Sequence, residues 1–262
     1  MKRLIRRALR SVSIGTSIAK AWCAMTPLPK EDMHIHSTFS DGMHSVSQNV
    51  ERAESRGVTR MCCVDHVRRD TEWTAEFVAE VQSVDARSSI RVFSGVEAKF
   101  LDEDGTLDIP ASLPDVDFIY AADHQFPMGG RCMHPREVRS LLSRNVLTPE
   151  RAIRCLIRAN HQTMLRYERV VVAHFLSILP KVGLDESMVS LDDLHMLARC
   201  ARDEGAAFEI DERWRCPSPR VVKVLLEHGV PVFLSTDSHR RETIGIYDYA
   251  TKTLRAALEA RG

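Results

Sequence analysis

Two histidines separated by one residue stand near the start of the chain, in Met33-His34-Ile35-His36-Ser37-Thr38-Phe39-Ser40-Asp41-Gly42. Side chains alternate along an extended strand, so His34 and His36 are expected to point to the same side. Two converging imidazoles suit a first-row transition metal, and Asp41 adds an oxygen ligand just after the strand. Gly42 permits the turn that this requires. The stretch therefore predicts a strand that ends in a metal site, provided that other strand ends supply further ligands.

The composition is that of a globular protein. The chain has 262 residues, of which 44% are hydrophobic and 27% charged, and this length suits a single α/β barrel. Lys plus Arg and Asp plus Glu both number 36, so no global positive field favours a long nucleic-acid partner. The seven cysteines are odd in number and form no CxxC pair. They indicate reduced thiols and a cytoplasmic protein.

Residues 1–30 are interpreted as a basic extension that precedes a single domain over residues 31–262. The first ten residues carry five cationic side chains, and Leu4, Ile5, Ala8, Leu9 and Val12 fall on one helical face. The apolar run is short and interrupted, which disfavours a secretory signal, and nothing reaches transmembrane length. We expect no stable membrane association. A weak export signal or a membrane-surface contact is the alternative for this segment.

From residue 31 onward, short apolar strands alternate with helices. The predicted strands are 32–36, 60–64, 90–97, 117–122, 170–173, 207–210 and 232–234. Ser45 and Gln48 form a capping-box pattern at the start of one helix. Repeated strand–helix units predict parallel strands with helices on the outside, and seven strands predict a closed or nearly closed barrel. Residues 125–169 are too long for a plain crossover and predict a helical insertion that acts as a lid or a buttress.

Ionisable residues follow almost every predicted strand. Chemistry in parallel α/β barrels is located at the carboxyl ends of the strands. Six histidines, two aspartates and one glutamate occupy such positions, and burying them without partners would be costly. These candidate ligands are His34, His36, Asp41, His66, Glu97, His124, His174, Asp237 and His239.

Together these motifs resemble the polymerase-and-histidinol-phosphatase (PHP) superfamily over about residues 31–245. The pieces that carry the resemblance are the quoted stretch at 33–42, Val64-Asp65-His66, Gly95-Val96-Glu97, Asp123-His124, Ala173-His174, Phe208-Glu209-Ile210-Asp211 and Ser235-Thr236-Asp237-Ser238-His239. The resemblance implies a distorted seven-stranded (β/α)7 barrel with a trinuclear metal site at the C-terminal strand ends.

The resemblance also implies the ligand sets and the cofactors. His34, His36, Glu97 and Asp237 would hold the first ion, and Glu97 would bridge to a second ion held with His124 and His174. Asp41, His66 and His239 would hold the third. Three divalent ions of manganese, zinc or iron are expected, because mixed nitrogen and oxygen ligands suit all three metals. Glu97, Asp237 and His239 are the expected catalytic residues, and Asp65 is expected to orient a neighbouring ligand.

The predicted reaction is hydrolysis of a small phosphomonoester, such as a phosphorylated nucleoside, a sugar phosphate or histidinol phosphate, by a hydroxide held between two metals. Arginines near the mouth are candidates for binding the phosphate, with Arg215 preferred. The candidates are Arg215, Arg213, Arg68, Arg131 and Arg240. A phosphodiesterase or nuclease acting on short nucleotides or cyclic phosphates is one alternative, and a metal-stabilised interaction module without catalysis is another. The sequence leaves the oligomeric state open.

Overall fold

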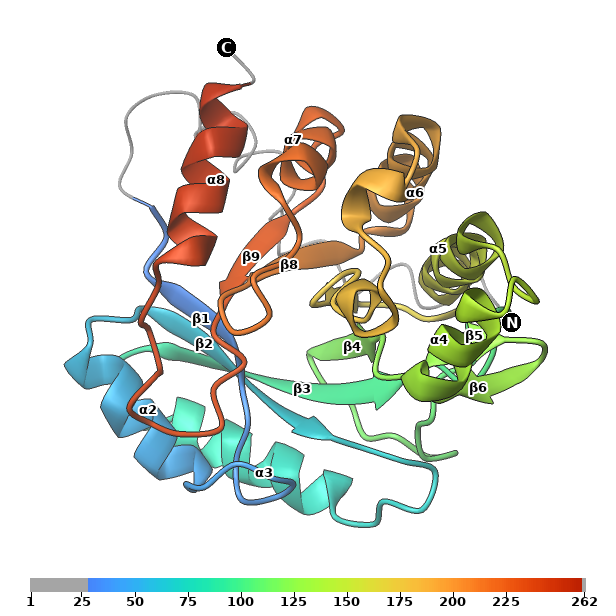
Figure 1. The fold of residues 1–262 in the computed structure, drawn as a ribbon. Helices are drawn as coiled ribbons and strands as arrows, with labels where there is room; N and C mark the ends of the chain where they lie inside the picture. The colour runs from blue at the N-terminus through green and yellow to red at the C-terminus, as the bar shows by residue number, and fades with distance from the viewer. Residues whose placement is uncertain (1–27, 261–262) are drawn as a thin grey trace.

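The computed structural model describes residues 28–260, in which seven parallel strands form a nearly closed barrel surrounded by helices (Figure 1). Neighbours in the sheet follow the chain order, and the first and last strands lie side by side. The strands are β1 (Glu31–Ile35), β2 (Arg60–His66), β3 (Arg91–Lys99), β4 (Phe118–Ala122), β7 (Val170–Ala173), β8 (Ala207–Asp211) and β9 (Val232–Ser235). The predicted seven-stranded α/β barrel is confirmed. The predicted extension over residues 1–30 lies almost wholly outside the described residues.

Side chains complete the seam between β1 and β9. Carboxylate oxygens of Glu31 and Asp32 accept hydrogen bonds from the backbone N–H groups of Leu234 at 2.9 Å and Thr236 at 3.0 Å. Burial raises the pKa of the Asp32 carboxyl to about 7, against the opposing effect of the hydrogen bonds that it accepts. Beyond the carboxyl ends of the two strands, the N–H of His36 donates to the carbonyl of Ser238 at 2.8 Å. These contacts bring the end of β9 against the residues that follow β1.

Five helices of the described residues cover the strands β2, β3, β8 and β9 or the helices beside them. They are α2 (Val46–Ser55), α3 (Thr74–Asp85), α6 (Leu191–Glu204), α7 (Pro219–Glu227) and α8 (Tyr249–Glu259). At the start of α2, the Ser45 hydroxyl accepts from the Gln48 N–H at 3.3 Å, and the Gln48 side chain accepts from the Ser45 N–H at 3.0 Å. The predicted capping box is therefore present. None of the helices in residues 28–260 is both long and apolar enough to cross a membrane.

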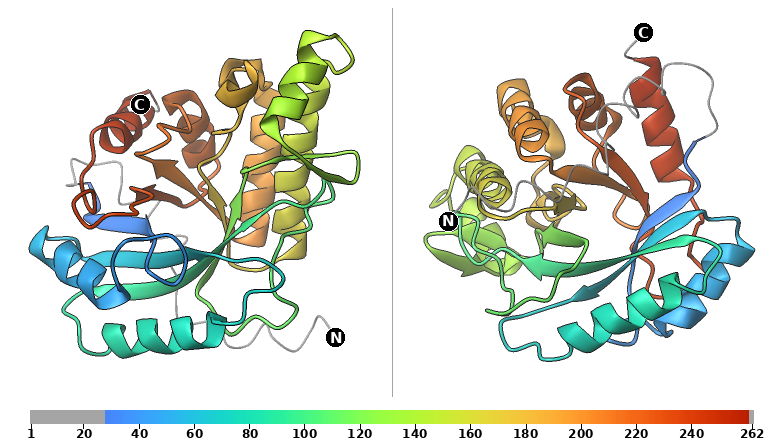
Figure 2. Two further views of the ribbon diagram at one scale, coloured as in Figure 1. Left: turned by 60° about the horizontal axis from the view of Figure 1, so that its bottom comes forward. Right: turned by 180° about the vertical axis from the view of Figure 1, so that it is seen from behind.

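The segment between β4 and β7 contains more structure than the sequence predicted. A β-hairpin of β5 (Phe126–Met128) and β6 (Arg131–Met133) precedes α4 (Pro135–Ser143) and α5 (Pro149–Arg166). The long helix α5 packs alongside α6 and covers β7 from outside, and Figure 2 shows the two helices running together. Two short 3₁₀ helices, η1 (Leu179–Val182) and η2 (Glu186–Met188), follow β7. Of the helical part of the predicted insertion, α5 is thus packed onto the barrel wall, whereas α4 contacts η1.

The interior of the barrel changes character along its length. One half is filled by apolar and aromatic side chains that point inward from all seven strands: Met33, Cys62, Val64, Tyr120, Ala122, Val171, Ala173, Ala207 and Phe233, with Phe93 and Phe118 packed against them. Inward-facing positions nearer the carboxyl ends of the strands carry ionisable groups instead, such as Glu97 on β3 and Glu209 on β8. The apolar half closes the barrel beneath the site described next.

Candidate metal centre

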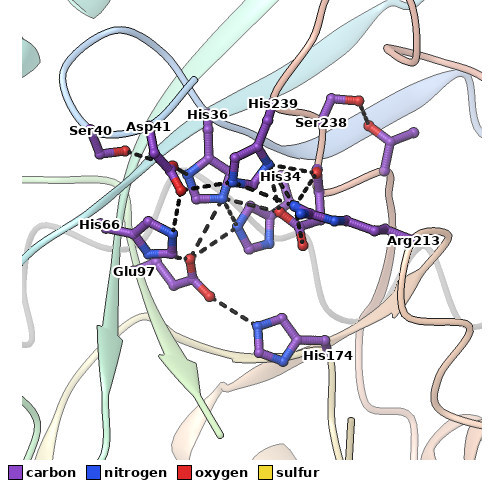
Figure 3. Close-up of polar contacts among 12 residues, drawn as sticks. His34, His36, Ser40, Asp41, His66, Glu97, His174, Arg213, Ser238 and His239 are labelled. Atoms are coloured by element: carbon purple, nitrogen blue, oxygen red, sulfur yellow. Dashed lines mark hydrogen bonds and ion pairs between the residues drawn. The ribbon is translucent and has the colours of Figure 1, made fainter. Parts of the chain in front are cut away.

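Glu97 lies at the centre of the ionisable cluster at the barrel mouth (Figure 3). Its side chain is 1% exposed. Oxygen Oε1 lies 3.1 Å from Nε2 of His124 and 3.0 Å from Nε2 of His174. Oxygen Oε2 lies 2.8 Å from Nδ1 of His66. His34 and His36 each place Nε2 3.6 Å from the same oxygen. One carboxylate therefore faces imidazoles from five different positions in the chain.

Asp237 approaches the cluster from the loop after β9. Its Oδ1 lies 3.1 Å from Nε2 of His36 and 3.4 Å from Nδ1 of His239. The backbone of Asp237 is left-handed, with φ 48°, and His174 also has a positive φ of 28°. Such conformations are costly for residues other than glycine and concentrate at functional sites, where surrounding contacts enforce them.

Asp41, His66 and His239 form the more open side of the centre. Oδ2 of Asp41 lies 3.2 Å from Nε2 of His239 and 3.5 Å from Nε2 of His66. The exposed fractions of these side chains are 54% for Asp41, 34% for His66 and 21% for His239, whereas the side chains of His34 and His36 are fully buried. A ligand approaching the barrel mouth would therefore meet this side first.

Asp65 supports the loop that carries Asp41. Its carboxylate accepts the N–H groups of Ser37 at 3.0 Å and Ser40 at 3.1 Å, and both serine hydroxyls donate to it at 2.6 Å and 2.5 Å. The residue after Asp41, Gly42, must lack a side chain, because a Cβ at this position would lie 2.4 Å from the backbone of His36. Asp65 thus positions the loop of one candidate ligand rather than the ring of its neighbour His66.

The donor atoms fit divalent cations. Groups of three or four imidazole and carboxylate donor atoms lie within 4.8 Å of one another, including His36 with Asp41, His66 and His239. Nε2 of His34 faces Nε2 of His36 at 3.1 Å. Within residues 28–260, the buried Nδ1 of His36 and Oε2 of Glu97 have charged neighbours at ion-pair distance but no partner in hydrogen-bonding geometry. Buried polar atoms are normally satisfied, and this combination of nitrogen and oxygen donors suits zinc, manganese or iron.

Burial and neighbouring charges shift the pKa values of several groups in the cluster in opposite directions. Burial would raise the pKa of the Glu97 carboxyl, but His124, His174 and His34 outweigh it and hold that pKa well below its usual range. Burial also opposes the positive form of His174, yet contacts with Asp123 and Glu97 raise the pKa of this imidazole well above its usual value. For His36 burial prevails and lowers the pKa. The Glu97 carboxylate is therefore expected to be ionised beside these imidazoles.

Two buried carboxylates behind the histidines were not assigned a role from the sequence. Oε2 of Glu209 lies 3.0 Å from Nδ1 of His34, and its Oε1 accepts the backbone N–H of His174 at 2.5 Å. Oδ1 of Asp123 lies 3.0 Å from Nδ1 of His174 and accepts the Ser177 hydroxyl at 2.7 Å. A carboxylate behind an imidazole fixes its tautomer and orientation. Both residues stand within the quoted motifs, and a carboxylate at or just after a strand end was the available signal.

The structure brings one of the five candidate arginines to the cluster. Nη1 of Arg213 lies 2.7 Å from Nδ1 of His239 and 3.3 Å from Oδ2 of Asp237. Arg215, the preferred candidate, instead places its guanidinium 5.4 Å from the ring centre of Tyr249. Arg131 pairs with Glu137 at 2.6 Å. The last two, Arg68 and Arg240, are exposed, and neither forms an ion pair within residues 28–260.

Comparison with protein families and curated proteins gives partial matches. A family model described as PHP domain matches residues 32–211. The DNA polymerase/3′-5′ exonuclease PolX of Bacillus subtilis is 33% identical over 104 residues, which cover 36% of this chain and 18% of that protein. The phosphoribosyl 1,2-cyclic phosphate 1,2-diphosphodiesterase of Eggerthella lenta is 38% identical over 72 residues, which cover 28% of this chain and 25% of that protein. The matches thus span a quarter or less of these relatives.

Among solved structures, a histidinol phosphate phosphatase from Lactococcus lactis superposes with a TM-score of 0.61. The superposition covers 88% of this chain and 93% of that chain, at 18% sequence identity. That crystal structure contains zinc, L-histidinol and phosphate. At this level of identity, the likeness establishes a shared fold.

Proposed function

The chain belongs to the PHP domain family, and we propose that it is a metal-dependent phosphatase that hydrolyses a small phosphomonoester. The observation that carries the proposal is the arrangement around Glu97, where five imidazoles face one buried carboxylate. No position of the expected ligand set is replaced by a residue unable to bind metal. This argues against an interaction module that has kept the fold and lost catalysis.

Three divalent cations are the proposed cofactors, with manganese, zinc or iron as candidates. Zinc is supported by its presence in the histidinol phosphate phosphatase of the same fold. His34, His36, Glu97 and Asp237 would hold the first, Glu97 with His124 and His174 the second, and Asp41 with His66 and His239 the third. When bound, such cations neutralise phosphoryl oxygens and lower the pKa of a coordinated water.

The chain's own residues would orient the substrate around this centre. Arg213 has a side chain that is 47% exposed, and its contacts to Asp237 and His239 all involve Nη1. The other guanidinium nitrogens therefore remain available to donate to phosphoryl oxygens, a geometry for which arginine is well suited. Asp237 and His239 contact Arg213 directly. Glu97 connects the two histidines that face its Oε1 with the three that face its Oε2. These three residues are the proposed catalytic groups.

A phosphodiesterase acting on a cyclic or short nucleotide is the second candidate. It is favoured by the Eggerthella lenta relative, which is named for hydrolysis of a cyclic phosphate. A long nucleic acid is disfavoured because cationic and anionic residues balance and aromatic residues make up only 6% of the chain. We therefore propose a small phosphorylated molecule as the partner. A cytoplasmic location is also proposed, because all six cysteines in the described part of the chain are free.

The test is phosphate release from a panel of monoesters and cyclic or linear diesters by protein stripped of metal and reloaded with zinc, manganese or iron. We expect activity to return only with metal and to be highest on a monoester. The variant His174→Ala should lose activity by about 10²-fold or more, as when one preorganised electrostatic group is removed. His195→Ala is the matched control, because His195 lies outside the barrel, where it contacts His228.

Three outcomes would reject parts of this proposal. Full activity of folded His174→Ala would overturn the assigned centre. Hydrolysis confined to diesters would replace the monoesterase by the second candidate. Stoichiometric metal binding without turnover of any ester would favour the non-catalytic module.

A further inference from the structure

A partly exposed tryptophan forms one wall of the metal centre. Trp214 is 38% exposed, although its indole Nε1 donates to Oδ2 of Asp237 at 2.8 Å. Its ring centre lies 6.0 Å from that of His174, and the Arg213 guanidinium carbon lies 5.7 Å from it. The hydrogen bond to Asp237 fixes the indole in place. The exposed part of the ring therefore belongs to the rim of the site.

A lysine lies over this indole. Nζ of Lys181 is 4.2 Å from the Trp214 ring centre, at a distance typical of a cation–π contact. Lys181 belongs to η1, in the same segment after β7 that carries His174. Lys181 and His174 thus approach the indole of Trp214 from the same segment of the chain. Arg213, whose guanidinium also lies against this ring, reaches into the cluster toward His239 (Figure 3).

The positive charge of Lys181 is not paired with any carboxylate of the described residues. Within residues 28–260, no carboxylate lies within 4.0 Å of its amine, and the residue is exposed. By contrast, Lys223 pairs with Glu227 at 3.8 Å and Lys252 with Asp248 at 2.6 Å, although Lys30, which is also exposed, has no ion pair among the described residues. The cation–π contact orients the amine without neutralising it. An oriented, uncompensated cation beside a phosphate-binding centre suits a second anionic group of the ligand.

We propose that Lys181, held over Trp214, binds a second anionic group on the leaving group of the substrate. The proposal rests on the phosphatase function argued above and deepens it. The preferred substrates are then phosphoesters whose leaving group carries a carboxylate or a second phosphate. An ammonium-bearing leaving group, such as histidinol, is disfavoured by repulsion from the same amine.

The kinetic test compares two-carbon phosphoesters that differ only in the group at the far end. These are phosphoglycolate with a carboxylate, ethylene glycol bisphosphate with a phosphate, 2-hydroxyethyl phosphate with a neutral hydroxyl, and phosphoethanolamine with an ammonium group. We expect kcat/KM for at least one anionic ester to exceed that for the neutral ester by about tenfold, as for a charge-assisted hydrogen bond. The cationic ester should be slowest. The two anionic esters distinguish carboxylate from phosphate.

A binding measurement makes the test independent of turnover. Calorimetric titration would use the non-hydrolysable analogues 3-phosphonopropionate, 3-hydroxypropylphosphonate and 3-aminopropylphosphonate with the metal-loaded protein. Lys181→Met keeps the length of the side chain and should remove the preference for the anionic analogue. Lys181→Glu should reverse it in favour of the cationic one. Lys223→Met on α7 is the control and should leave the preference unchanged.

The outcomes separate this inference from the function on which it rests. Equal affinities for the three analogues, or a preference that survives Lys181→Met, would overturn the inference while phosphatase activity stood. Failure to release phosphate from every ester with every metal would instead reject the proposed function. A preference that disappears in Lys181→Met and reverses in Lys181→Glu would support the role of Lys181.

Discussion

The two halves of the barrel interior are built by the same strands and have opposite chemistry. On β4, Tyr120 and Ala122 fill the apolar half, and His124 two positions later faces Glu97. On β2, Val64 belongs to the apolar half and His66 to the cluster. On these two strands the alternation of side chains is preserved and only the residue type changes, whereas on β1 the register shifts between Asp32 and Ile35, so that Met33 joins the apolar half and its neighbour His34 the cluster.

This difference shows how stability and function are divided within one core. Apolar burial stabilises the fold wherever it occurs, whereas buried ionisable groups cost free energy unless they are paired or bind a ligand. Concentrating the costly groups at the carboxyl ends leaves the other half free to close the barrel. Substitutions in the two halves should therefore separate stability from activity.

The largest effect is expected for Phe233→Ala in the apolar half. Phe233 is 8% exposed and packs edge-to-face against Phe118, with ring centres 5.7 Å apart. Removing a buried phenyl group typically costs about 3–5 kcal/mol, so the free energy of unfolding measured in urea should fall by this amount. The kcat of the protein that remains folded should change little. A large loss of kcat without loss of stability would contradict the division between the halves.

In the ionisable half of the barrel interior, Glu97→Gln should lower the activity and leave the stability of the fold largely unchanged. The substitution keeps the shape of the side chain but removes the charge that faces five imidazoles. We expect kcat/KM to fall by about 10²–10³-fold, the usual effect of losing one preorganised electrostatic group, together with a lower metal content by elemental analysis. Urea unfolding of the metal-free proteins is the control, and it should not show a loss comparable with that of Phe233→Ala.

The features of the fold that depend on local sequence pattern could be predicted from the sequence. Strand–helix alternation predicted the seven strands of the barrel, and the pairing of Ser45 with Gln48 predicted a helix start that the structure confirms. The hairpin of β5 and β6 was missed because its strands have three residues each and Pro127 interrupts the first. A signal existed in Gly129-Gly130, whose positive φ angles of 67° and 70° are typical of a two-residue hairpin turn.

The sequence did not predict in which direction the arginine side chains near the site would point. Arg213 and Arg215 are separated by one residue, yet Arg213 reaches His239 and Arg215 lies over Tyr249. Arg215 has a left-handed backbone with φ 54°, which no local motif indicated. Residue type alone could not choose between two arginines on one loop.

The smallest effect we consider tests a contact that joins residues far apart in the sequence. Glu209 lies on β8, 175 residues after His34, and it contacts both the His34 ring and the backbone of His174. Glu209→Gln keeps a hydrogen-bond acceptor but removes the negative charge behind the imidazole. Loss of such a supporting group typically lowers metal affinity or activity by about 10–100-fold.

Metal affinity, measured by competition with a chelator, is the decisive readout for Glu209→Gln. Weaker metal binding with an unchanged midpoint of metal-free unfolding would place Glu209 in the functional half, as its contacts suggest. A lower unfolding midpoint with unchanged metal affinity would assign it to the apolar half that supports the fold. Because Glu209 is buried between the two halves, this result locates the boundary at which the core changes from a stabilising to a functional role.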